Sequence, residues 1–318
     1  MNEIAGVALA FVVSLVVVLV ITPICIPLLQ RLKVGQEVRD DGPRTHLKKQ
    51  GTATMGGVVI ILGAGIAGFI FTSDVYETSL LFIIMLGCGL LGLWDDFLKV
   101  VLRRPLGLRA RAKVIGQLLV GIILAWGSSM LGRGTLIAVP YTGIELEAGF
   151  LYYIFVVLVL VATANAVNLT DGLDGLASGL MVIISAAFVL IALLTGHYAV
   201  AVFAGALGGA CLGFLRYNYH PARIFMGDTG SLALGGVLAA LAVLTGTELL
   251  LMILGGVFVL EVLSVIIQVI SFQLTGKRVF KMSPLHHHFE LSGWAEVKVV
   301  HVFWLIGLCF AILGLLAI

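Results

Sequence analysis

Residues 5–29 read AGVALAFVVSLVVVLVITPICIPLL, a largely apolar run that contains no charged side chain. At about 1.5 Å per residue, a helix of this length rises roughly 37 Å, which exceeds the roughly 30 Å hydrocarbon core of a bilayer. The run lacks a basic start and an obvious small-residue cleavage site, and it is too long for the apolar region of a signal peptide. It therefore predicts a transmembrane helix that is retained.

The rest of the chain has the same character. Of its 318 residues, 60% are hydrophobic and 11% are charged, and the mean hydropathy is +1.15. A soluble domain of this length could not bury so much apolar surface. We expect an all-α polytopic membrane protein with about ten transmembrane helices in a single domain, residues 1–318. The predicted spans are 5–29, 55–71, 78–94, 114–131, 150–167, 175–194, 198–215, 231–244, 249–272 and 299–318. The eighth is the weakest, because residues 245–248 separate it only thinly from the ninth.

Lysine and arginine are concentrated in loops that follow odd-numbered spans. The loops after the first, third, seventh and ninth spans hold 6, 6, 2 and 4 of the 19 basic residues, which is 18 in total, and only Arg133 lies on the other side. Loops rich in lysine and arginine remain in the cytoplasm. The distribution therefore predicts that both termini face outward and that the basic loops are cytoplasmic.

Several polar or reactive side chains lie inside the predicted spans. All four cysteines do so, and no two form a CxxC pair, so the sequence indicates neither a disulfide framework nor a cysteine metal site. Glu261 and Gln268 interrupt the ninth span. Polar residues at such positions face protein or a groove more often than lipid. We expect both to face a groove.

The motifs that could carry chemistry share one side with the basic loops. They are Asp95-Asp96 after the third span, NLTDGLDG at 168–175 after the fifth, Gly227-Asp228 after the seventh, and three histidines at 286–288 after the ninth. Carboxylates crowded at a membrane surface are costly unless a cation or substrate compensates their charge. The pattern favours a metal-dependent active site that faces one compartment.

Asp95 and Asp96 end the third span, one turn before Lys99. Adjacent residues of a helix point to different sides. We therefore expect one carboxylate to face the site and the other to orient a helix end or a neighbouring lysine. A solvated helix end is the alternative, but an aspartate at a helix C-terminus opposes the helix dipole. We expect Asp96 to be the more pH-sensitive of the two.

The other acidic motifs each have a structural alternative. Asp171 and Asp174 would share a helix face, and the glycines beside them let a ligand approach the backbone. Alternatively, Asp174 is the N-cap of the sixth span. Asp228 precedes the expected start of the eighth span and could also be an N-cap, whereas its companions Asn218 and Ser231 favour a polar site.

Histidines and lysines complete the polar set. Three successive histidines, residues 286–288, do not present one tripod to a zinc ion, so imidazoles near phosphates are the better interpretation. Residues 46–57 combine Lys48 and Lys49 with a glycine-rich turn, which suits phosphate oxygens or, alternatively, anionic lipid headgroups. Together with the carboxylates, these residues favour phosphoryl-group chemistry with Mg²⁺ or Mn²⁺.

Five motifs follow one another in order: KKQGTATMGG (48–57), WDDFLK (94–99), NLTDGLDGLA (168–177), FMGDTGS (225–231) and PLHHHFE (284–290). In this order they resemble the motifs of the phospho-N-acetylmuramoyl-pentapeptide transferase family, the bacterial translocases that form lipid I. The resemblance covers nearly the whole chain. One departure is Ala53, where the family usually has proline, and it implies a more flexible turn.

The resemblance implies transfer of phospho-MurNAc-pentapeptide from UDP-MurNAc-pentapeptide to undecaprenyl phosphate, with release of UMP and with Mg²⁺ as cofactor. It implies ten transmembrane helices, usually in a homodimer, with a cleft that faces the cytoplasm. The location would be the bacterial cytoplasmic membrane, with the lipid bilayer as partner and no nucleic acid. Two chemical routes stay open, a covalent aspartyl intermediate and direct attack by the lipid phosphate.

The resemblance also implies roles for individual residues. The implied catalytic residues are Asp95, Asp96, Asp228, His286, His287 and His288, with Asp228 as the metal ligand. The implied substrate-binding residues are Lys48, Lys49, Thr54, Lys99, Lys113, Asn168, Asp171, Asp174, Asn218, Ser231 and Gln268.

Two alternatives compete with this interpretation. A sister enzyme that transfers a HexNAc-1-phosphate to a polyprenyl phosphate would fit the aspartate motifs, but the PLHHHFE and Thr-Met-Gly-Gly segments favour the muramoyl enzyme. An ion-coupled transporter would need charges near the bilayer midplane and repeat-related broken helices. Here the charges lie at the ends of the predicted spans, and the sequence shows no repeat.

The predicted orientation can be tested by labelling. We expect Asp41→Cys and Glu147→Cys, each in a cysteine-free background, to react with an impermeant thiol reagent from opposite sides of the membrane, because loops rich in lysine and arginine stay cytoplasmic. Position 147 should label in intact cells, and position 41 only after permeabilisation. Equal labelling of both positions in intact cells would exclude this arrangement.

Overall fold

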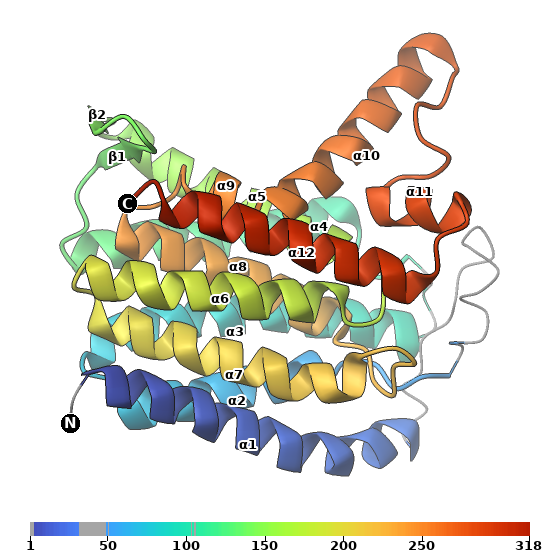
Figure 1. The fold of residues 1–318 in the computed structure, drawn as a ribbon, viewed down its shortest axis with the longest axis horizontal. Helices are drawn as coiled ribbons and strands as arrows, with labels where there is room; N and C mark the ends of the chain where they lie inside the picture. The colour runs from blue at the N-terminus through green and yellow to red at the C-terminus, as the bar shows by residue number, and fades with distance from the viewer. Residues whose placement is uncertain (1–2, 32–48, 50, 103, 105) are drawn as a thin grey trace.

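The computed structural model describes residues 3–31, 49, 51–102, 104 and 106–318, so Lys48 lies outside the described residues (Figure 1). The helices are α1 (Glu3–Arg31), α2 (Gly57–Phe71), α3 (Val75–Val100), α4 (Ala110–Met130), α5 (Leu151–Thr170), α6 (Leu176–Leu194), α7 (Tyr198–Asn218), α8 (Gly227–Thr245), α9 (Leu251–Leu254), α10 (Gly256–Thr275), α11 (Leu285–Leu291) and α12 (Glu296–Leu315). The strands are β1 (Leu136–Val139) and β2 (Ile144–Glu147).

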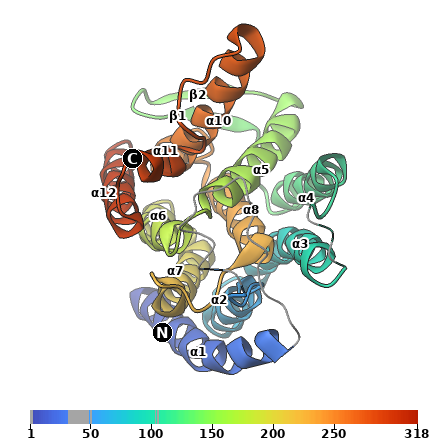
Figure 2. The ribbon, with the colours of Figure 1, turned by 90° about the vertical axis from the view of Figure 1, so that its right-hand side faces the viewer.

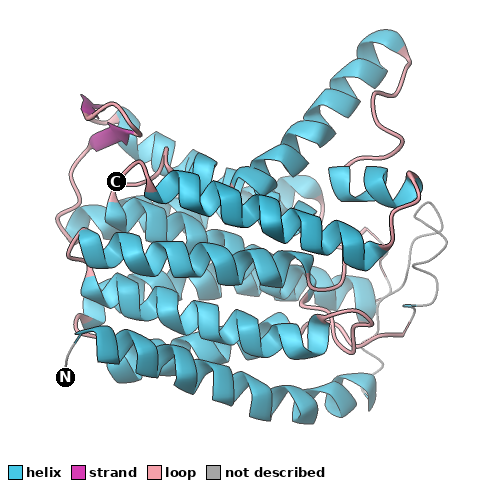
Figure 3. Cartoon of the chain, in the orientation of Figure 1, coloured by secondary structure: helices cyan, strands magenta, loops and turns pink. Residues whose placement is uncertain are grey.

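Long apolar helices dominate the fold. In the described part of the chain, nine helices are long and apolar enough to cross a membrane, and α2, with 15 residues, is a shorter apolar helix. Each predicted span overlaps one of these ten helices, and the ninth span also includes the short α9. The prediction of an all-α polytopic membrane protein is therefore confirmed (Figure 3).

The centre of the bundle is α8, which Figure 2 shows end-on with α2, α3, α5, α6 and α7 around it. From Thr229 to Thr245 every residue of α8 is buried. Close approach depends on glycine: a Cβ on Gly92 of α3 would lie 2.0 Å from the carbonyl oxygen of Asp228, and one on Gly57 of α2 would lie 2.1 Å from the amide nitrogen of Gly230. The first turn of α8 is therefore held between α2 and α3.

Helices at the edge of the bundle bury only one stripe. In α1 the buried side chains include Val7, Ala10, Ser14 and Val18, which recur every three or four residues. Large apolar residues between them, such as Val16, are half exposed. A surface of this kind suits lipid rather than water, because burying it in hydrocarbon is favourable. The exposed apolar residues thus mark the lipid-facing side of these helices.

The predicted ninth span, 249–272, differs from the structure because it is two helices. Gly255, at φ −90° and ψ 24°, separates the short α9 from α10. Figure 1 shows α10 leaning away from the neighbouring helices. Its buried residues all lie in its first half, and the last of them is Ser264. The break thus redirects the chain, so that the second half of α10 has few protein neighbours.

Both termini lie at the end of the bundle that carries the β1–β2 hairpin, as Figure 1 shows. Here Arg133, the one basic residue outside the odd loops, pairs with Glu248 at 3.2 Å and donates to the carbonyl of Val243 at 3.0 Å. Tyr152 donates a hydrogen bond to the same Glu248 carboxylate at 2.5 Å. Arg133 therefore has a structural partner, which accounts for its departure from the charge distribution.

The glycine contact between α3 and α8 yields a prediction. We expect Gly92→Ala to lower the free energy of unfolding by about 1–3 kcal/mol, because the added methyl group meets backbone atoms that cannot rotate away. Thermal unfolding in detergent measures the effect. The matched control is Gly134→Ala, since a Cβ there has nothing within 4 Å. Equal midpoints for the two variants would refute the close-packing argument.

Candidate active site

Four helix ends bring their polar side chains together at the end of the bundle opposite the hairpin. Asp95 and Asp96 come from the end of α3, Lys113 from the start of α4, Asn168 from the end of α5, and Asp228 from the first turn of α8. Their side chains are linked by the contacts described below. Three of the four motifs that the sequence analysis grouped therefore contribute to one polar cluster, and the histidines of the fourth lie elsewhere, as described below.

Asp228 is the centre of this cluster. Its Oδ2 atom lies 3.0 Å from Lys99 Nζ and 2.5 Å from Lys113 Nζ. Its Oδ1 atom accepts a hydrogen bond from Asn168 Nδ2 at 3.1 Å, and the same amide group donates to Ser231 Oγ at 2.8 Å. Asp228 does not cap α8, so its N-cap alternative is excluded. Its carboxylate is free to face the lysines.

Asp95 shares the two lysines with Asp228. Its Oδ2 atom lies 2.5 Å from Lys99 Nζ and 3.2 Å from Lys113 Nζ, and its Oδ1 atom accepts a hydrogen bond from the Leu108 amide at 2.7 Å. The Asp95 side chain is fully buried. Asp95 therefore fixes the positions of two ammonium groups and also holds the loop that leads into α4.

Asp96 points to the other side of α3 and binds the start of α8. Its oxygens accept hydrogen bonds from the amides of Asp228 at 3.1 Å and Thr229 at 2.9 Å, and from the Thr229 hydroxyl at 2.6 Å. A carboxylate at this place satisfies free amides and complements the positive end of the helix dipole. Gly227 permits the contact, because at φ 69° a Cβ would lie 2.5 Å from Asp96 Oδ2. The expected division between the two aspartates is thus visible in the structure.

The first glycine-rich loop lies beside the start of α8. The Ala53 carbonyl accepts a hydrogen bond from the Phe225 amide at 2.8 Å. In return, the Gly56 amide donates to the Phe225 carbonyl and the Gly57 amide donates to the Met226 carbonyl. Ala53 contributes its carbonyl to this pairing, which a proline would also provide. Thr54 is buried beside Gly227, since a Cβ on Gly227 would lie 3.0 Å from Thr54 Oγ1.

Lys49 belongs to a second polar cluster. It lies 2.7 Å from Asp174 Oδ1 and 2.5 Å from Glu296 Oε1. Asp174 Oδ2 also lies 3.0 Å from His220 Nδ1 and accepts from the Ala222 amide at 3.0 Å. The N-cap position of α6 is occupied by Gly175 without a side-chain cap, so the N-cap alternative for Asp174 is excluded.

Asp171 lies between the two clusters in sequence and has a different environment. Among the described residues, no side chain donates a hydrogen bond or forms an ion pair with its carboxylate. Burial raises the pKa of Asp171 well above its usual range, and the negative charges of Asp228, Asp96 and Asp174 raise it further. A carboxyl group without a cationic partner, whose pKa is raised by three other carboxylates, is an environment in which a bound cation is favourable.

Two predicted substrate-binding residues brace loops. Asn218 Oδ1 accepts from the Gly175 amide at 3.1 Å and from the Ser178 hydroxyl at 2.9 Å, and its Nδ2 donates to the Ile224 carbonyl at 3.0 Å. Gln268 Oε1 accepts from the amides of Val279 and Phe280, and its Nε2 donates to the Phe280 carbonyl. The amide groups of both side chains are thus engaged by the protein itself.

The three histidines lie on α11, which the sequence did not predict. His286 Nδ1 lies 3.1 Å from Glu261 Oε1, His287 Nδ1 lies 2.9 Å from Glu290 Oε2, and His288 Nδ1 accepts from the Lys281 amide at 3.1 Å. They contact different partners, as expected of successive residues on one helix. In the described residues, none of the three belongs to a group that could hold a metal ion.

Two groups of side chains in the described part of the chain could hold a cation. One is Asp95, Asp96 and Asp228, and the other is Asp174, His220 and Glu296; within each group the ligand atoms lie within 4.8 Å of one another. The first offers only carboxylate oxygens, which Mg²⁺ prefers. It also adjoins Asp171, which has no cationic partner among the described residues, whereas the second group includes the His220 imidazole; lysine ammonium groups contact both groups. The first group therefore fits a hard divalent cation better.

Sequence reasoning missed His220, Glu296 and Thr229 as members of these clusters. His220 and Glu296 stand outside the five motifs, although both lie in predicted cytoplasmic loops. Thr229 lies inside FMGDTGS and immediately follows Asp228. The sequence carried a signal for Thr229, since hydroxyl residues at helix starts often complete a cap.

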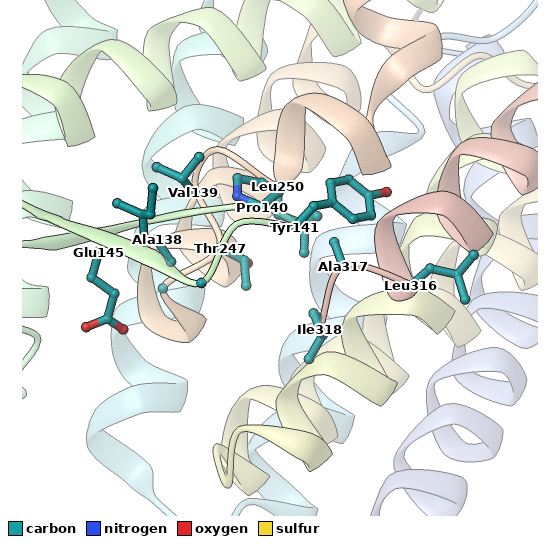
Figure 4. Close-up of a pocket in the computed structure, with 13 residues that line it drawn as sticks. Ala138, Val139, Pro140, Tyr141, Glu145, Thr247, Leu250, Leu316, Ala317 and Ile318 are labelled. Carbon is teal, nitrogen blue, oxygen red and sulfur yellow. The ribbon is translucent and has the colours of Figure 1, made fainter.

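The opposite end of the molecule holds a cavity of about 450 Å³, shown in Figure 4. It lies between the hairpin, the loop after α8 and the end of α12. It is lined by Ala138, Val139, Pro140, Tyr141, Gly143, Ile144, Glu145, Gly246, Thr247, Leu250, Leu316, Ala317 and Ile318. None of the predicted site residues lines it, so this cavity is separate from the polar clusters.

Comparison with known proteins places the chain in a family. A model of glycosyl transferase family 4 matches residues 78–246. The chain is 52% identical over 323 residues to a phospho-N-acetylmuramoyl-pentapeptide-transferase of Desulfitobacterium hafniense, covering 97% of this chain and 96% of the relative. The chain belongs to this transferase family. Relatives with the same name share 54% identity in Desulforamulus reducens, covering 97% of this chain and 94% of the relative, and 50% in Halalkalibacterium halodurans, covering 96% of each. Family membership thus agrees with the resemblance seen in the motifs.

The separate contacts of the two aspartates predict different local effects in this transferase-family chain. We expect Asp96→Ala to speed amide exchange at Asp228 and Thr229, and Asp95→Ala to speed it at Leu108. Loss of a helix cap costs about 1 kcal/mol, which corresponds to roughly fivefold faster exchange where local opening limits it. Hydrogen–deuterium exchange of peptides covering 106–110 and 226–231 measures both. The same pattern in both variants would contradict the division.

Proposed function

We propose that this chain transfers phospho-MurNAc-pentapeptide from UDP-MurNAc-pentapeptide to undecaprenyl phosphate and so forms lipid I and UMP. The observation that carries the proposal is the cluster of Asp95, Asp228, Lys99 and Lys113 at a helix-bundle end, in a chain similar over nearly its whole length to relatives of that name. The reaction moves a phosphoryl group between two anionic substrates. A site that combines carboxylates with ammonium groups suits such a transfer.

Lys99 and Lys113 would act on the diphosphate of the nucleotide sugar. In the structure both ammonium groups rest on carboxylates, at 2.5–3.2 Å. These contacts orient the lysines before substrate arrives. We propose that they turn towards phosphate oxygens and stabilise the negative charge that develops on the leaving UMP. Asn168, which donates to Asp228, would hold that carboxylate in place.

Mg²⁺ is the proposed cofactor, with Asp228 as its ligand and Asp95 beside it. Bound there, the ion would neutralise diphosphate charge and favour attack on phosphorus. Asp96 has a different task, since both its oxygens already accept amide hydrogen atoms of α8. It holds the first turn of α8, and therefore Asp228, at a fixed position.

The second cluster suits the nucleotide sugar. The first loop places Lys49 beside Asp174 and Glu296. Asn218 accepts a hydrogen bond from the Gly175 amide and so holds the turn that contains Asp174. We propose that Lys49 and Asp174 of this cluster contribute to binding of UDP-MurNAc-pentapeptide, together with Thr54 and Ser231, which lie near Asp228. The alternative donor chemistry, transfer of a HexNAc-1-phosphate by a sister enzyme, would use the same aspartates but is less well supported, because the relatives named above share the muramoyl-transferase name.

Orientation and assembly follow the same proposal. We propose that the end carrying the polar clusters faces the cytoplasm, where UDP-linked precursors are made, and that both termini face outward. The concentration of basic residues in the loops of that end supports this orientation. We also propose a homodimer that functions in the bacterial cytoplasmic membrane as a single domain over residues 1–318.

The reaction can be tested directly. Purified protein in detergent is supplied with UDP-MurNAc-pentapeptide, undecaprenyl phosphate and Mg²⁺, and UMP release is measured. We expect turnover with this donor and none with UDP-GlcNAc. Turnover with UDP-GlcNAc but not with the muramoyl donor would transfer the assignment to the sister enzyme. Absence of product with either donor would reject the proposal.

Substitution of Asp228 is the most direct test of the proposed metal ligand. We expect Asp228→Asn to lower UMP release by about 100- to 1,000-fold while the protein stays folded, because the shape is kept but the charge that holds the cation and the lysines is lost. A Mg²⁺ titration accompanies the assay. Asp74→Asn is the matched control, since Asp74 caps α3 at the other end of the bundle. Near-normal turnover of Asp228→Asn at limiting Mg²⁺ would remove Asp228 from the metal site.

A further inference from the structure

A buried glutamate–histidine pair joins α10 to α11. Glu261 and His286 are both fully buried. Glu261 Oε1 lies 3.1 Å from His286 Nδ1 and 3.3 Å from the His286 amide nitrogen. Burying a carboxyl group in an apolar helix is costly. Such a pair therefore calls for an explanation beyond packing.

The pair selects one tautomer of the imidazole. An ionised carboxylate only accepts hydrogen bonds, so the proton of a neutral His286 ring must lie on Nδ1 when it contacts Glu261. Nε2 is then a bare acceptor. In the described part of the chain, buried His286 Nε2 has no hydrogen-bond partner, and neither does the second Glu261 oxygen, Oε2. Buried polar atoms are rarely left without partners, so the unpaired Nε2 atom is a candidate for contact with a ligand.

The free nitrogen faces the loop that carries Asp171 and Asp174. A Cβ placed on Gly172 would lie 2.2 Å from His286 Nε2, which means that the imidazole lies directly against the backbone of this loop. Any side chain at position 172 would displace the ring. Because residue 172 is a glycine, the unpaired Nε2 atom of His286 can lie beside the proposed substrate site.

We propose that Glu261 is a positioning residue for the transfer reaction: it holds His286 as the Nδ1–H tautomer and aims Nε2, as an acceptor, at a hydrogen-bond donor of substrate bound over the 171–175 loop. This inference rests on the proposed function. It goes beyond it by assigning a role to a residue of α10. Orienting carboxylates behind a functional histidine act in this way in many sites, where they fix the tautomer and the ring direction.

The neighbouring histidines differ in geometry. His287 pairs with Glu290 on its own helix, three residues away. His288 Nδ1 accepts the Lys281 amide hydrogen, so its neutral ring carries the proton on Nε2. His286 contacts a carboxylate from another helix, that of Glu261, and lies against the NLTDGLDG loop. Since Glu261 lies in the buried first half of α10, the position of that helix and the direction of Nε2 are coupled.

Glu261→Gln tests the proposal, because glutamine keeps the size but can donate to Nδ1 and so favour the opposite tautomer. We expect kcat for UMP release to fall about 10- to 100-fold, with little change in KM for the nucleotide sugar. Glu77→Gln is the matched control: Glu77 lies 2.9 Å from His197 Nδ1 at the other end of the bundle, and we expect its kcat to be unchanged.

A double-variant cycle separates positioning from a general structural effect. If Glu261 acts through His286, Glu261→Gln should change kcat less than about twofold in a His286→Gln background. The same full loss in both backgrounds would overturn the proposal, as would wild-type kcat for Glu261→Gln. If the wild-type protein itself releases no UMP, the proposed function fails, and the measurement below still decides this inference.

Nitrogen NMR of ¹⁵N-histidine-labelled protein reads the tautomer without activity. The signals that disappear in His286→Gln identify the ring. We expect the intact protein to show a protonated Nδ1 and a bare Nε2 for this residue at neutral pH. A protonated Nε2 and a bare Nδ1 would overturn the proposal. Because the wild-type chain is used, this result also decides the matter if Glu261→Gln fails to fold, and Glu261→Asp, which keeps the charge, should then retain part of the activity.

Discussion

The contact between Asp96 and the first turn of α8 is the constraint on which the rest of the site depends. Gly92 and Gly57 let α3 and α2 approach the backbone of that turn, and the Asp96 carboxylate then accepts the Asp228 and Thr229 amides. Without this cap, a helix that is buried along nearly its whole length would begin with unpaired amides in a low-dielectric setting, which is costly. The cap also sets the direction of the Asp228 side chain. Asp96, which holds the start of α8, is thus in direct contact with Asp228, which is proposed to hold the cation.

Charge compensation explains how so many carboxylates coexist. Lys99 and Lys113 bridge Asp95 and Asp228, while Lys49 bridges Asp174 and Glu296. Lys99 and Lys113 share one pair of carboxylates and balance only these, whereas Lys49 is one cation for two carboxylates. Carboxyl groups stay in excess, because Asp96 and Asp171 form no ion pair among the described residues. An incompletely neutralised site attracts cations and, once a cation is bound, anionic phosphates. Stability alone would favour fewer buried charges, so the excess indicates function.

Apolar runs and basic loops predicted the ten spans and the gathering of the motifs, because hydrocarbon thickness and loop charge act on long segments. Other features depend on tertiary contacts that leave no periodic signal. The break at Gly255 looks, in sequence, like a tolerated glycine within a span. The ion pair of Lys49 with Glu296 joins residues 247 positions apart. Asn218 and Gln268 could be recognised as polar from the sequence, but their bonds to loop backbone could not. The opposing directions of Asp95 and Asp96 were predictable, as were a lysine and a helix end as partners, but not which aspartate contacts which partner.

The two ends of the bundle use buried polar groups for different purposes. At the hairpin end, the Arg133 guanidinium group donates to Glu248 and to main-chain carbonyls, and it joins α4 to the loop after α8. At the other end, acceptors without a hydrogen-bond partner among the described residues include His286 Nε2, which lies against Gly172, next to Asp171 in the same loop. The polar groups of the first end join chain segments to one another, while those of the second leave acceptors that a ligand could contact. Since α10 leans out from the bundle and supplies Glu261 to the second end, its break at Gly255 belongs to the construction of the site.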